Sequence, residues 1–129
     1  MTERRTISSG GHWEPIYGYS RAVVVGDSCF VSGTTDAGPD GLTRHPGDPA
    51  GQAHGALEVI ERALESAGFS RGDVVRTRIY ITDRAQADAV GAVHGAFFRD
   101  VRPASAMILV GGFVDSSLLV EIEADARKG

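Results

Sequence analysis

The sequence predicts an α+β fold with the element order βββαβαββ, in which two helices pack on one face of a mixed sheet. Two segments carry apolar residues at helical spacing, and six shorter segments are rich in branched apolar residues and bounded by Gly, Pro or Asp. These patterns are typical of amphipathic helices and of strands. The helical segments are 49–67 and 84–99, and the strand segments are 5–8, 21–25, 28–34, 73–82, 103–110 and 118–126. At 129 residues, the chain is expected to form one domain over residues 1–129, large enough to need no disulfide or structural metal.

The first three strands precede a long loop. Residues 12–19 between the first two strands are expected to be irregular. Gly26-Asp27 separates the second strand from the third, and a two-residue loop of this kind suits a primed hairpin turn. Residues 35–47 contain three Gly, two Pro and two Asp. This composition predicts a loop, and loops of about a dozen residues often line sites.

Both helices have recognisable starts. Asp48 is expected to cap the first, Pro49 to open it and Gly68 to end it. Its apolar stripe consists of Ala53, Leu57, Ile60, Leu64 and Ala67. Asp83 is expected to cap the second helix, which runs to about Arg99. The inner side of that helix carries Val90, His94, Phe97 and Phe98.

Two strands alternate clearly between faces. In segment 73–82 the expected inner residues are Val75, Thr77, Ile79 and Ile81, opposite Arg76, Arg78, Tyr80 and Thr82. In segment 118–126 they are Val120, Ile122, Ala124 and Ala126, opposite Glu121, Glu123 and Asp125. Neighbouring carboxylates on one strand face lie roughly 7 Å apart, so in a sheltered cleft their repulsion of ~2 kcal/mol would raise the pKa of at least one. The alternative is a solvated face, or one whose charges Arg76 and Arg78 neutralise.

Some strands are apolar on both faces, notably residues 23–25, 108–110 and 118–120. That pattern marks strands buried on both sides, yet two helices cover one face only. A second copy of the chain is the economical cover, so the sequence predicts a homo-oligomer with sites available between subunits.

Composition excludes several functional classes. A net charge of −4 without a Lys/Arg run argues against nucleic-acid binding. The single Cys29 is expected to be an inert core thiol in a reducing compartment. Without an apolar run of about 18 residues or a signal-peptide pattern, the chain is expected to be cytoplasmic and away from membranes.

The four His are isolated, which predicts no metal site, and His94 is expected to pack rather than catalyse. Nucleotide-binding Gly-rich loops and a serine-hydrolase motif are absent from the sequence.

Three residues remain as candidates for chemistry. Tyr19 stands at a strand entry, where its hydroxyl can face a cleft or simply pack. Gly33 follows Phe30-Val31-Ser32, and a strand glycine of this kind marks close approach of a ligand or another backbone. Glu121 is the third, as one of the aligned carboxylates.

A set of short stretches occurs in a recognisable order along the chain: Gly18-Tyr19-Ser20-Arg21-Ala22, Phe30-Val31-Ser32-Gly33, Ala67-Gly68, Asp73-Val74-Val75-Arg76-Thr77, Ile79-Tyr80-Ile81-Thr82-Asp83, Ala96-Phe97-Phe98, Pro103-Ala104 and Val120-Glu121-Ile122-Glu123-Ala124. Through these stretches the whole chain resembles the RidA/YjgF (reactive intermediate deaminase) family. The resemblance implies a homotrimer with a chorismate-mutase-like fold, pockets between subunits, and cofactor-free hydrolysis of enamines and imines. It implies that Tyr19 lines the pocket, that Gly33 offers backbone hydrogen bonds and that Glu121 activates water. Ser32, Ala104, Trp13 and Arg21 complete the expected binding residues.

Position 105 departs from that family pattern. Deaminases of the family carry an Arg after Pro-Ala that clamps the substrate carboxylate, whereas this chain has Ser105. Each charge-assisted bond of such a clamp contributes ~1.5–3 kcal/mol, so affinity for amino-acid-derived imines should fall unless another cation substitutes. Arg21, where the family usually has Gln, is one candidate, and Arg78 and Arg102 are the others. Gly91 stands where active members often have Asn.

These observations predict a protein that hydrolyses an imine or enamine. Its substrate is expected to be non-standard, because Ser105 replaces the Arg that would bind a carboxylate. The alternative is a non-catalytic small-molecule sensor or a chaperone-like interaction module on the same trimer. A ribonuclease activity, which some relatives carry, fits poorly with the acidic charge and the lack of a basic run.

Overall fold

The computed structural model describes residues 3–129 as one six-stranded mixed sheet with two long helices on one face. The strands are β1 (Arg4–Ile7), β2 (Ala22–Val25), β3 (Ser28–Thr34), β4 (Val74–Ile81), β5 (Ala104–Leu109) and β6 (Val120–Arg127). The helices are α1 (Glu14–Tyr17), α2 (Pro49–Ser66) and α3 (Ala87–Phe97), with short 3-10 turns at Arg71–Asp73 and Arg84–Gln86. The predicted α+β class and its strand and long-helix order are confirmed.

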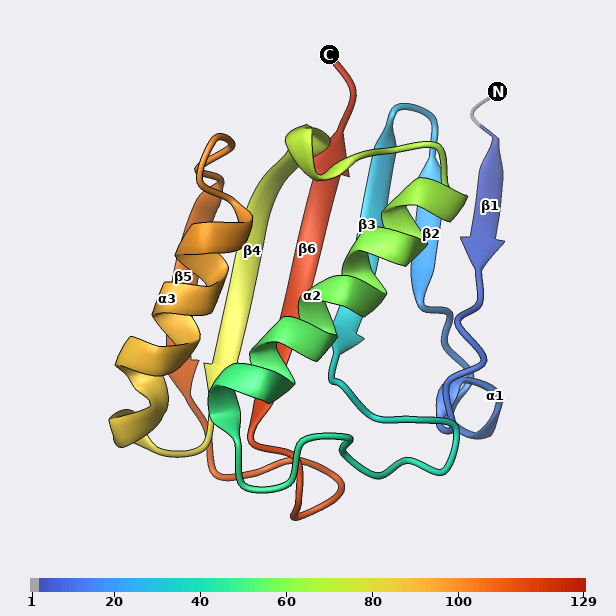
Figure 1. Cartoon of the computed structure of the whole chain (residues 1–129). Helices are drawn as coiled ribbons and strands as arrows, with labels where there is room; N and C mark the ends of the chain where they lie inside the picture. Colours follow the sequence, from blue (N-terminus) through green and yellow to red (C-terminus); the bar gives the residue numbers. More distant parts are fainter. Residues whose placement is uncertain (1–2) are drawn as a thin grey trace.

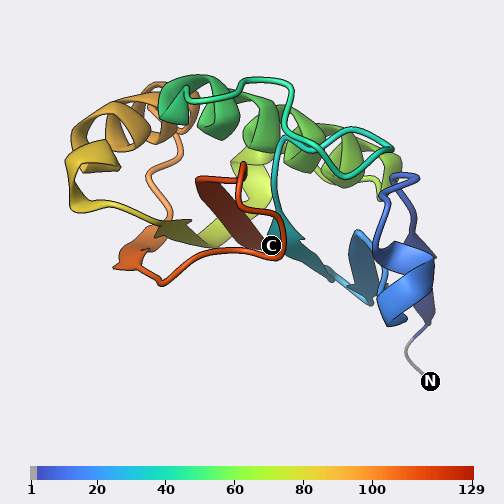
Figure 2. The same ribbon diagram turned by 90° about the horizontal axis from the view of Figure 1, so that it is seen from below.

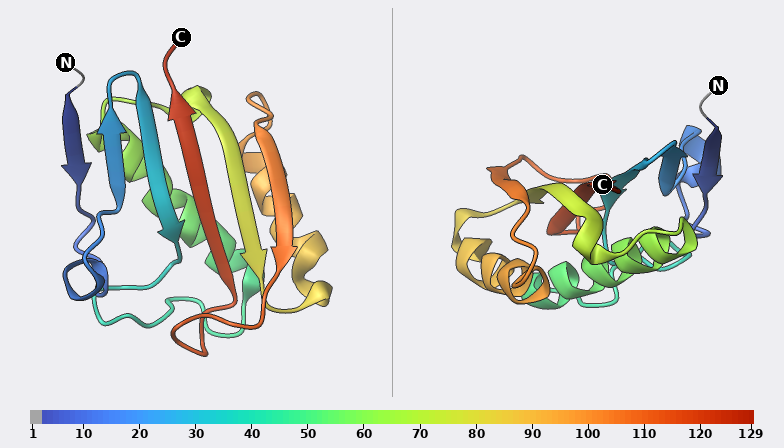
Figure 3. Two further views of the ribbon diagram at one scale, coloured as in Figure 1. Left: turned by 180° about the vertical axis from the view of Figure 1, so that it is seen from behind. Right: turned by 90° about the horizontal axis from the view of Figure 1, so that it is seen from above.

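The sheet order β1-β2-β3-β6-β4-β5 places the last strand of the chain in the middle (Figure 1). β6 pairs antiparallel with both β3 and β4, and only the β4–β5 pair is parallel. Figures 2 and 3 show α2 and α3 together on one face of the curved sheet, with α1 beyond the sheet end and neither long helix on the opposite face. The fold is therefore two layers deep, with one sheet face left open in the single chain.

The core lies between α2, α3 and the sheet. The α2 stripe is buried as predicted, and Asp48 caps the helix by accepting a hydrogen bond from the Gly51 amide. Gly68 follows α2 with a φ of +86°, the left-handed conformation that glycine adopts without strain. β6 alternates as expected, because Val120, Ile122, Ala124 and Ala126 are buried against the helices.

Two local predictions were wrong. Residues 12–19 are not irregular throughout, because Glu14–Tyr17 forms the short helix α1, which ends at Gly18 with a φ of +74°. Val75 is not an inner residue: 51% of it is exposed, and Val74 is buried in its place. The cause is a shift in the β4–β6 register between Val74 and Arg76, because an extra residue in a strand changes which side chains point inward.

The open face of the sheet carries both apolar and charged side chains. Phe30 of β3 and Ile108 of β5 are 49% and 38% exposed. Their neighbours along each strand point to the helix side of the sheet. Between their strands, Arg78 of β4 pairs with Glu123 of β6 at 3.1 Å. Ile108 belongs to the segment 108–110, for which the sequence predicts a covering partner, and Phe30 adds a second exposed apolar residue to the same face.

Candidate functional site

A cavity of about 590 Å³ opens where β3 ends and β6 begins, beside α1. Six of the eight predicted site residues line it: Trp13, Tyr19, Arg21, Ser32, Gly33 and Glu121. Its far wall comes from the loop between β5 and β6, which contributes Phe113 and Val114. A volume of this size is typical of small-molecule pockets.

The β3–β6 ladder is irregular where the cavity opens. Val31 pairs with Ala124 and Thr34 pairs with Ile122, so β3 carries one more residue than β6 between these two pairs. The extra residue creates a bulge at Ser32-Gly33 and leaves local backbone groups outside the ladder. Ser32 is fixed there, because its amide donates to Arg21 O at 2.9 Å and its hydroxyl donates to Ser20 O at 2.6 Å.

Gly33 allows the Glu121 side chain to lie directly against the β3 backbone. A Cβ atom at position 33 would stand 2.7 Å from Glu121 Oε2 and 2.8 Å from Glu121 Cδ. No real side chain tolerates contacts this short, so the glycine is a steric requirement of this arrangement.

Glu121 differs from the other two carboxylates on its strand face. Glu123 accepts hydrogen bonds from Arg78 at 3.1 Å and from the Tyr80 hydroxyl at 3.0 Å, and Asp125 lies 3.6 Å from Arg78. Within residues 3–129, Glu121 forms no ion pair closer than 4.0 Å. Burial raises the pKa of Glu121, the charge of Glu123 raises it further, and the positive charge of Arg21 opposes both. The expected raised pKa therefore belongs to Glu121.

Arg21 is a buried cation, and both of its Nη atoms already donate hydrogen bonds. Its Nη1 donates to Gly33 O at 2.7 Å and to Thr34 Oγ1 at 2.8 Å, and its Nη2 donates to the Tyr19 hydroxyl at 3.4 Å. Its Nε lies 3.5 Å from Glu14 Oε2, an ion pair that lacks hydrogen-bond geometry. Arg21 thus orders the cavity wall, and few of its donors remain for a ligand.

Glu14 is the buried counter-charge of Arg21 and holds the 8–14 loop. Burial alone would raise its pKa, but hydrogen bonds from Ser9, Gly11 and Ser8, with the charge of Arg21, outweigh burial and lower it. The carboxylate therefore stays ionised between the loop and Arg21. This role was missed, since a Glu in an apparently irregular segment gives no sequence signal of burial.

Ser105 and Ala104 lie outside this cavity within one chain. Ser105 is exposed on the edge strand β5, and its Oγ accepts a 2.8 Å hydrogen bond from the hydroxyl of the fully buried Thr77. The Thr77 hydroxyl also lies 2.8 Å from His94 Nε2 of α3. Burial lowers the pKa of His94, so the imidazole is neutral near pH 7 and links to Ser105 through Thr77.

The remaining two candidate cations are placed differently. Arg78 is engaged by Glu123 and Asp125 on the open sheet face. Arg102 is exposed, with a φ of +52° that is unusual for a residue other than glycine, and it precedes β5 by two positions. Neither residue lines the cavity beside Glu121.

In residues 3–129, the His, Cys, Asp and Glu side chains form no group of three or more that could hold a metal ion. None of the helices described is both long and apolar enough to cross a membrane. Cys29, the free cysteine of the described chain, is buried in the core as predicted.

Comparison with known proteins covers nearly the whole chain. The family model described as endoribonuclease L-PSP matches residues 11–128. A RutC family protein of Pyrococcus horikoshii is 31% identical over 115 residues, which are 89% of this chain and 90% of that protein. The crystal structure of Rv2704 from Mycobacterium tuberculosis, described as a member of the highly conserved YjgF/YER057c/UK114 family, superposes with a TM-score of 0.88 at 44% identity, covering 98% of this chain and 100% of that one. The YjgF gene product of E. coli is 29% identical with a TM-score of 0.83, covering 97% and 99%.

Proposed function

Because this chain belongs to the endoribonuclease L-PSP family, whose relatives of known structure include YjgF, we propose that it hydrolyses the C=N bond of a small imine or enamine. Membership of this family supports a small-molecule-binding protein of the Rid type. The reaction, its substrate and the assembly described below are part of the proposal.

One observation carries the proposal: Glu121 is a carboxylate without an ion-pair partner among the described residues, on the wall of a cavity, with a raised pKa. A carboxylate in this condition holds its proton more tightly than an exposed Glu and can both accept and return it, which is the requirement for general acid–base catalysis. Glu121 lies beside the bulged backbone of Gly33, so a ligand bound there can meet both the base and the backbone of the bulge.

The steps balance without a cofactor. Glu121 takes a proton from water as the water oxygen adds to the imine carbon, and the C=N double bond becomes a C–N single bond. The nitrogen receives that proton from Glu121, directly or through the Tyr19 hydroxyl. Glu121 then takes the O–H proton of the resulting carbinolamine and returns it to the nitrogen, so that the C–N bond breaks, the C=O bond forms and ammonia or an amine leaves. An enamine enters the same route after protonation at carbon.

We place the complete site between subunits of a homotrimer. In a single chain, Ser105 and Ala104 lie on the edge strand β5, away from the cavity that holds Glu121. Phe30 and Ile108 on the open sheet face are 49% and 38% exposed in the single chain. A partner seated on this face would bury these residues and could bring its own β5 edge to the cavity. Sedimentation equilibrium tests this assembly, and Ile108→Glu should dissociate it.

The substrate we propose lacks a carboxylate at the Ser105 end. Thr77 has one hydroxyl proton, so when it donates to Ser105, the neutral His94 must donate from Nε2 to Thr77. The Ser105 hydroxyl then keeps its own proton for a ligand acceptor, such as a carbonyl oxygen. Arg21 and Arg78 are held by other residues, so neither provides a free guanidinium for a carboxylate.

A matched pair of carboxylate variants tests the chemistry. The substrates are a neutral imine and 2-iminopropionate, generated in situ, with semicarbazide to trap the unreacted imine. Glu121→Gln should reduce turnover at least about 100-fold, while Glu123→Gln, two residues along the same face, should leave it nearly unchanged. Equal turnover in wild type and Glu121→Gln would refute the role of Glu121. Saturable ligand binding without turnover in any variant would favour the sensor or interaction-module alternative.

A further inference from the structure

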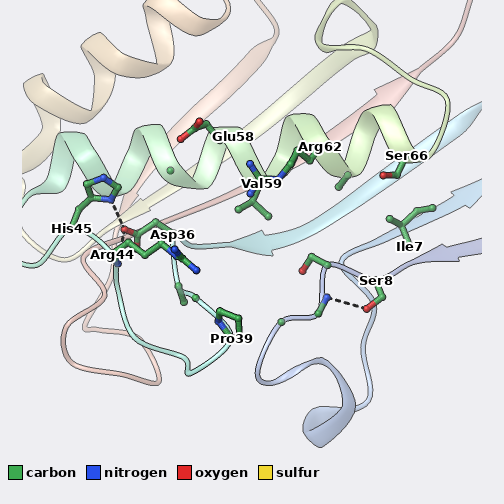
Figure 4. Close-up of a pocket in the computed structure, with 17 residues that line it drawn as sticks. Ile7, Ser8, Asp36, Pro39, Arg44, His45, Glu58, Val59, Arg62 and Ser66 are labelled. Carbon is green, nitrogen blue, oxygen red and sulfur yellow. Dashed lines mark hydrogen bonds and ion pairs between the residues drawn. The ribbon is translucent and has the colours of Figure 1, made fainter.

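A second cavity, of about 600 Å³, lies on the other side of the wall that bounds the first. Ser9, Gly11, Ala37 and Val59 line both cavities and form the partition between them. The second cavity is enclosed by the end of β1, the 36–45 loop and the outward side of α2 (Figure 4). None of the residues assigned above to imine chemistry lines it.

The 36–45 loop that forms its floor is rigidly built around one buried carboxylate. Asp36, which is 3% exposed, accepts hydrogen bonds from the Thr43 hydroxyl at 2.8 Å and the Arg44 amide at 3.2 Å, and its Oδ2 lies 2.8 Å from His45 Nδ1. The loop is also pressed onto α2 at Gly55, where an added Cβ would meet Asp36 Cβ at 2.7 Å. The backbone of this loop, including that of Arg44, is therefore held in place.

The charged residues of the cavity are unequally engaged. Of its two carboxylates, Asp36 is buried in the bonds just described, and the exposed Glu58 has Oε1 3.3 Å from Nδ1 of the exposed His54. Its two guanidiniums, on Arg44 and Arg62, form no ion pair closer than 4.0 Å with any residue in the range 3–129. Figure 4 shows Arg62 on α2 and Arg44 on the loop that faces this helix. The exposed Arg44 and Arg62 therefore offer guanidinium donors to an anion, although the carboxylates of Asp36 and Glu58 line the same cavity.

We propose that this second cavity binds a small molecule bearing an oxyanion, a phosphate or a carboxylate, between Arg44 and Arg62. Guanidinium groups match the planar, bidentate geometry of these anions better than ammonium groups do. A cavity of about 600 Å³ admits a molecule larger than a bare ion. Because the cavity shares only its partition with the first, binding here is independent of the proposed hydrolysis.

The test uses the full chain, with inorganic phosphate and succinate as probes, in calorimetric titrations at constant ionic strength. We expect saturable binding of at least one probe with a Kd in about the millimolar range, and probe-dependent shifts of backbone amide resonances in residues 36–45 and 58–66. The probe that binds more tightly identifies phosphate or carboxylate as the preferred group. The double variant Arg44→Gln/Arg62→Gln should bind at least about tenfold more weakly.

Two controls make the result decisive. Arg84→Gln/Arg99→Gln removes the same charge from exposed arginines that do not line either cavity, and Glu121→Gln alters only the first cavity. Both should bind the probe like wild type. Arg44→Lys/Arg62→Lys keeps the charge and should lose only part of the affinity. Absence of saturation, an equal loss in the Arg84/Arg99 control, or resonance shifts confined to the surroundings of Glu121 would each overturn the proposal.

Discussion

The Glu121 carboxylate lies in the space that a side chain at Gly33 would fill, with Oε2 2.7 Å from the position of an added Cβ. Gly33 lies in the bulge of β3, and Glu121 lies on the neighbouring strand β6. A larger side chain at position 33 should therefore move the Glu121 carboxylate.

Gly33→Ala should displace the Glu121 carboxylate and lower turnover of the imine substrate by about 100-fold, the typical effect of misplacing a catalytic group by about 1 Å. Gly95→Ala is the matched control, because Gly95 lies in α3 with nothing within 4 Å of its added Cβ. That variant should keep its turnover and gain about 0.5–1 kcal/mol of stability from better helix propensity. Full activity in Gly33→Ala would show that the carboxylate position is unimportant.

Glu121→Gln should be more stable than wild type at neutral pH. The pKa of Glu121 is raised above its ordinary value of 4.5, so the folded state holds its proton more tightly than the unfolded state. The stability contributed by that proton is complete below pH 4.5 and is lost as the pH rises through the raised pKa. Urea denaturation at a series of pH values should show the two proteins converging in acid and diverging above it. A variant less stable than wild type at neutral pH would contradict the sign.

Ser105→Arg should improve binding and turnover of 2-iminopropionate by about 10- to 100-fold, because it restores a charge-assisted partner for the carboxylate. Wild type should favour the neutral imine. Ser105→Gln adds length without charge and should give no such gain. Efficient hydrolysis of 2-iminopropionate by wild type would mean that another cation, such as Arg102, already binds the carboxylate.

Thr77→Val should lower the free energy of unfolding by about 1–3 kcal/mol, because it keeps the side-chain shape but leaves His94 Nε2 and Ser105 Oγ without the shared hydroxyl. Thr77→Ser retains the hydroxyl and should lose less. Thr6→Val on the exposed strand β1 should change stability by no more than about 0.5 kcal/mol. Chemical denaturation measures all three, and equal losses at positions 77 and 6 would show that the His94–Thr77–Ser105 chain has no structural role.

Periodicity predicted the fold well because most of it depends on local pattern and burial. The α2 stripe, the β6 alternation and the Gly26-Asp27 hairpin are all confirmed. Val75 failed because a bulge in β4 changes the face of a residue without changing its sequence pattern. The four-residue helix α1 failed because it carries too few residues to show a period.

Single residues of the candidate site could be predicted from the pattern of their own strand. Contacts between residues on different elements could not. Glu121 and Gly33 could be selected singly, but their contact depends on the β3–β6 register. The partnership of Glu14 with Arg21, and that of Thr77 with His94, join residues on different elements. No spacing along the chain encodes such pairs.

The central position of β6 has a consequence for how the protein is made. β6 follows every other strand in the chain, yet it separates β1-β2-β3 from β4-β5 in the finished sheet. During synthesis the ribosome therefore releases two incomplete half-sheets, and the β3 and β4 edges remain unpaired until the last strand emerges. Such edges can pair with other chains, so this interval is when the nascent protein most needs protection by a chaperone. A variant that weakens β6 should consequently reduce the yield of folded protein more than its effect on equilibrium stability suggests.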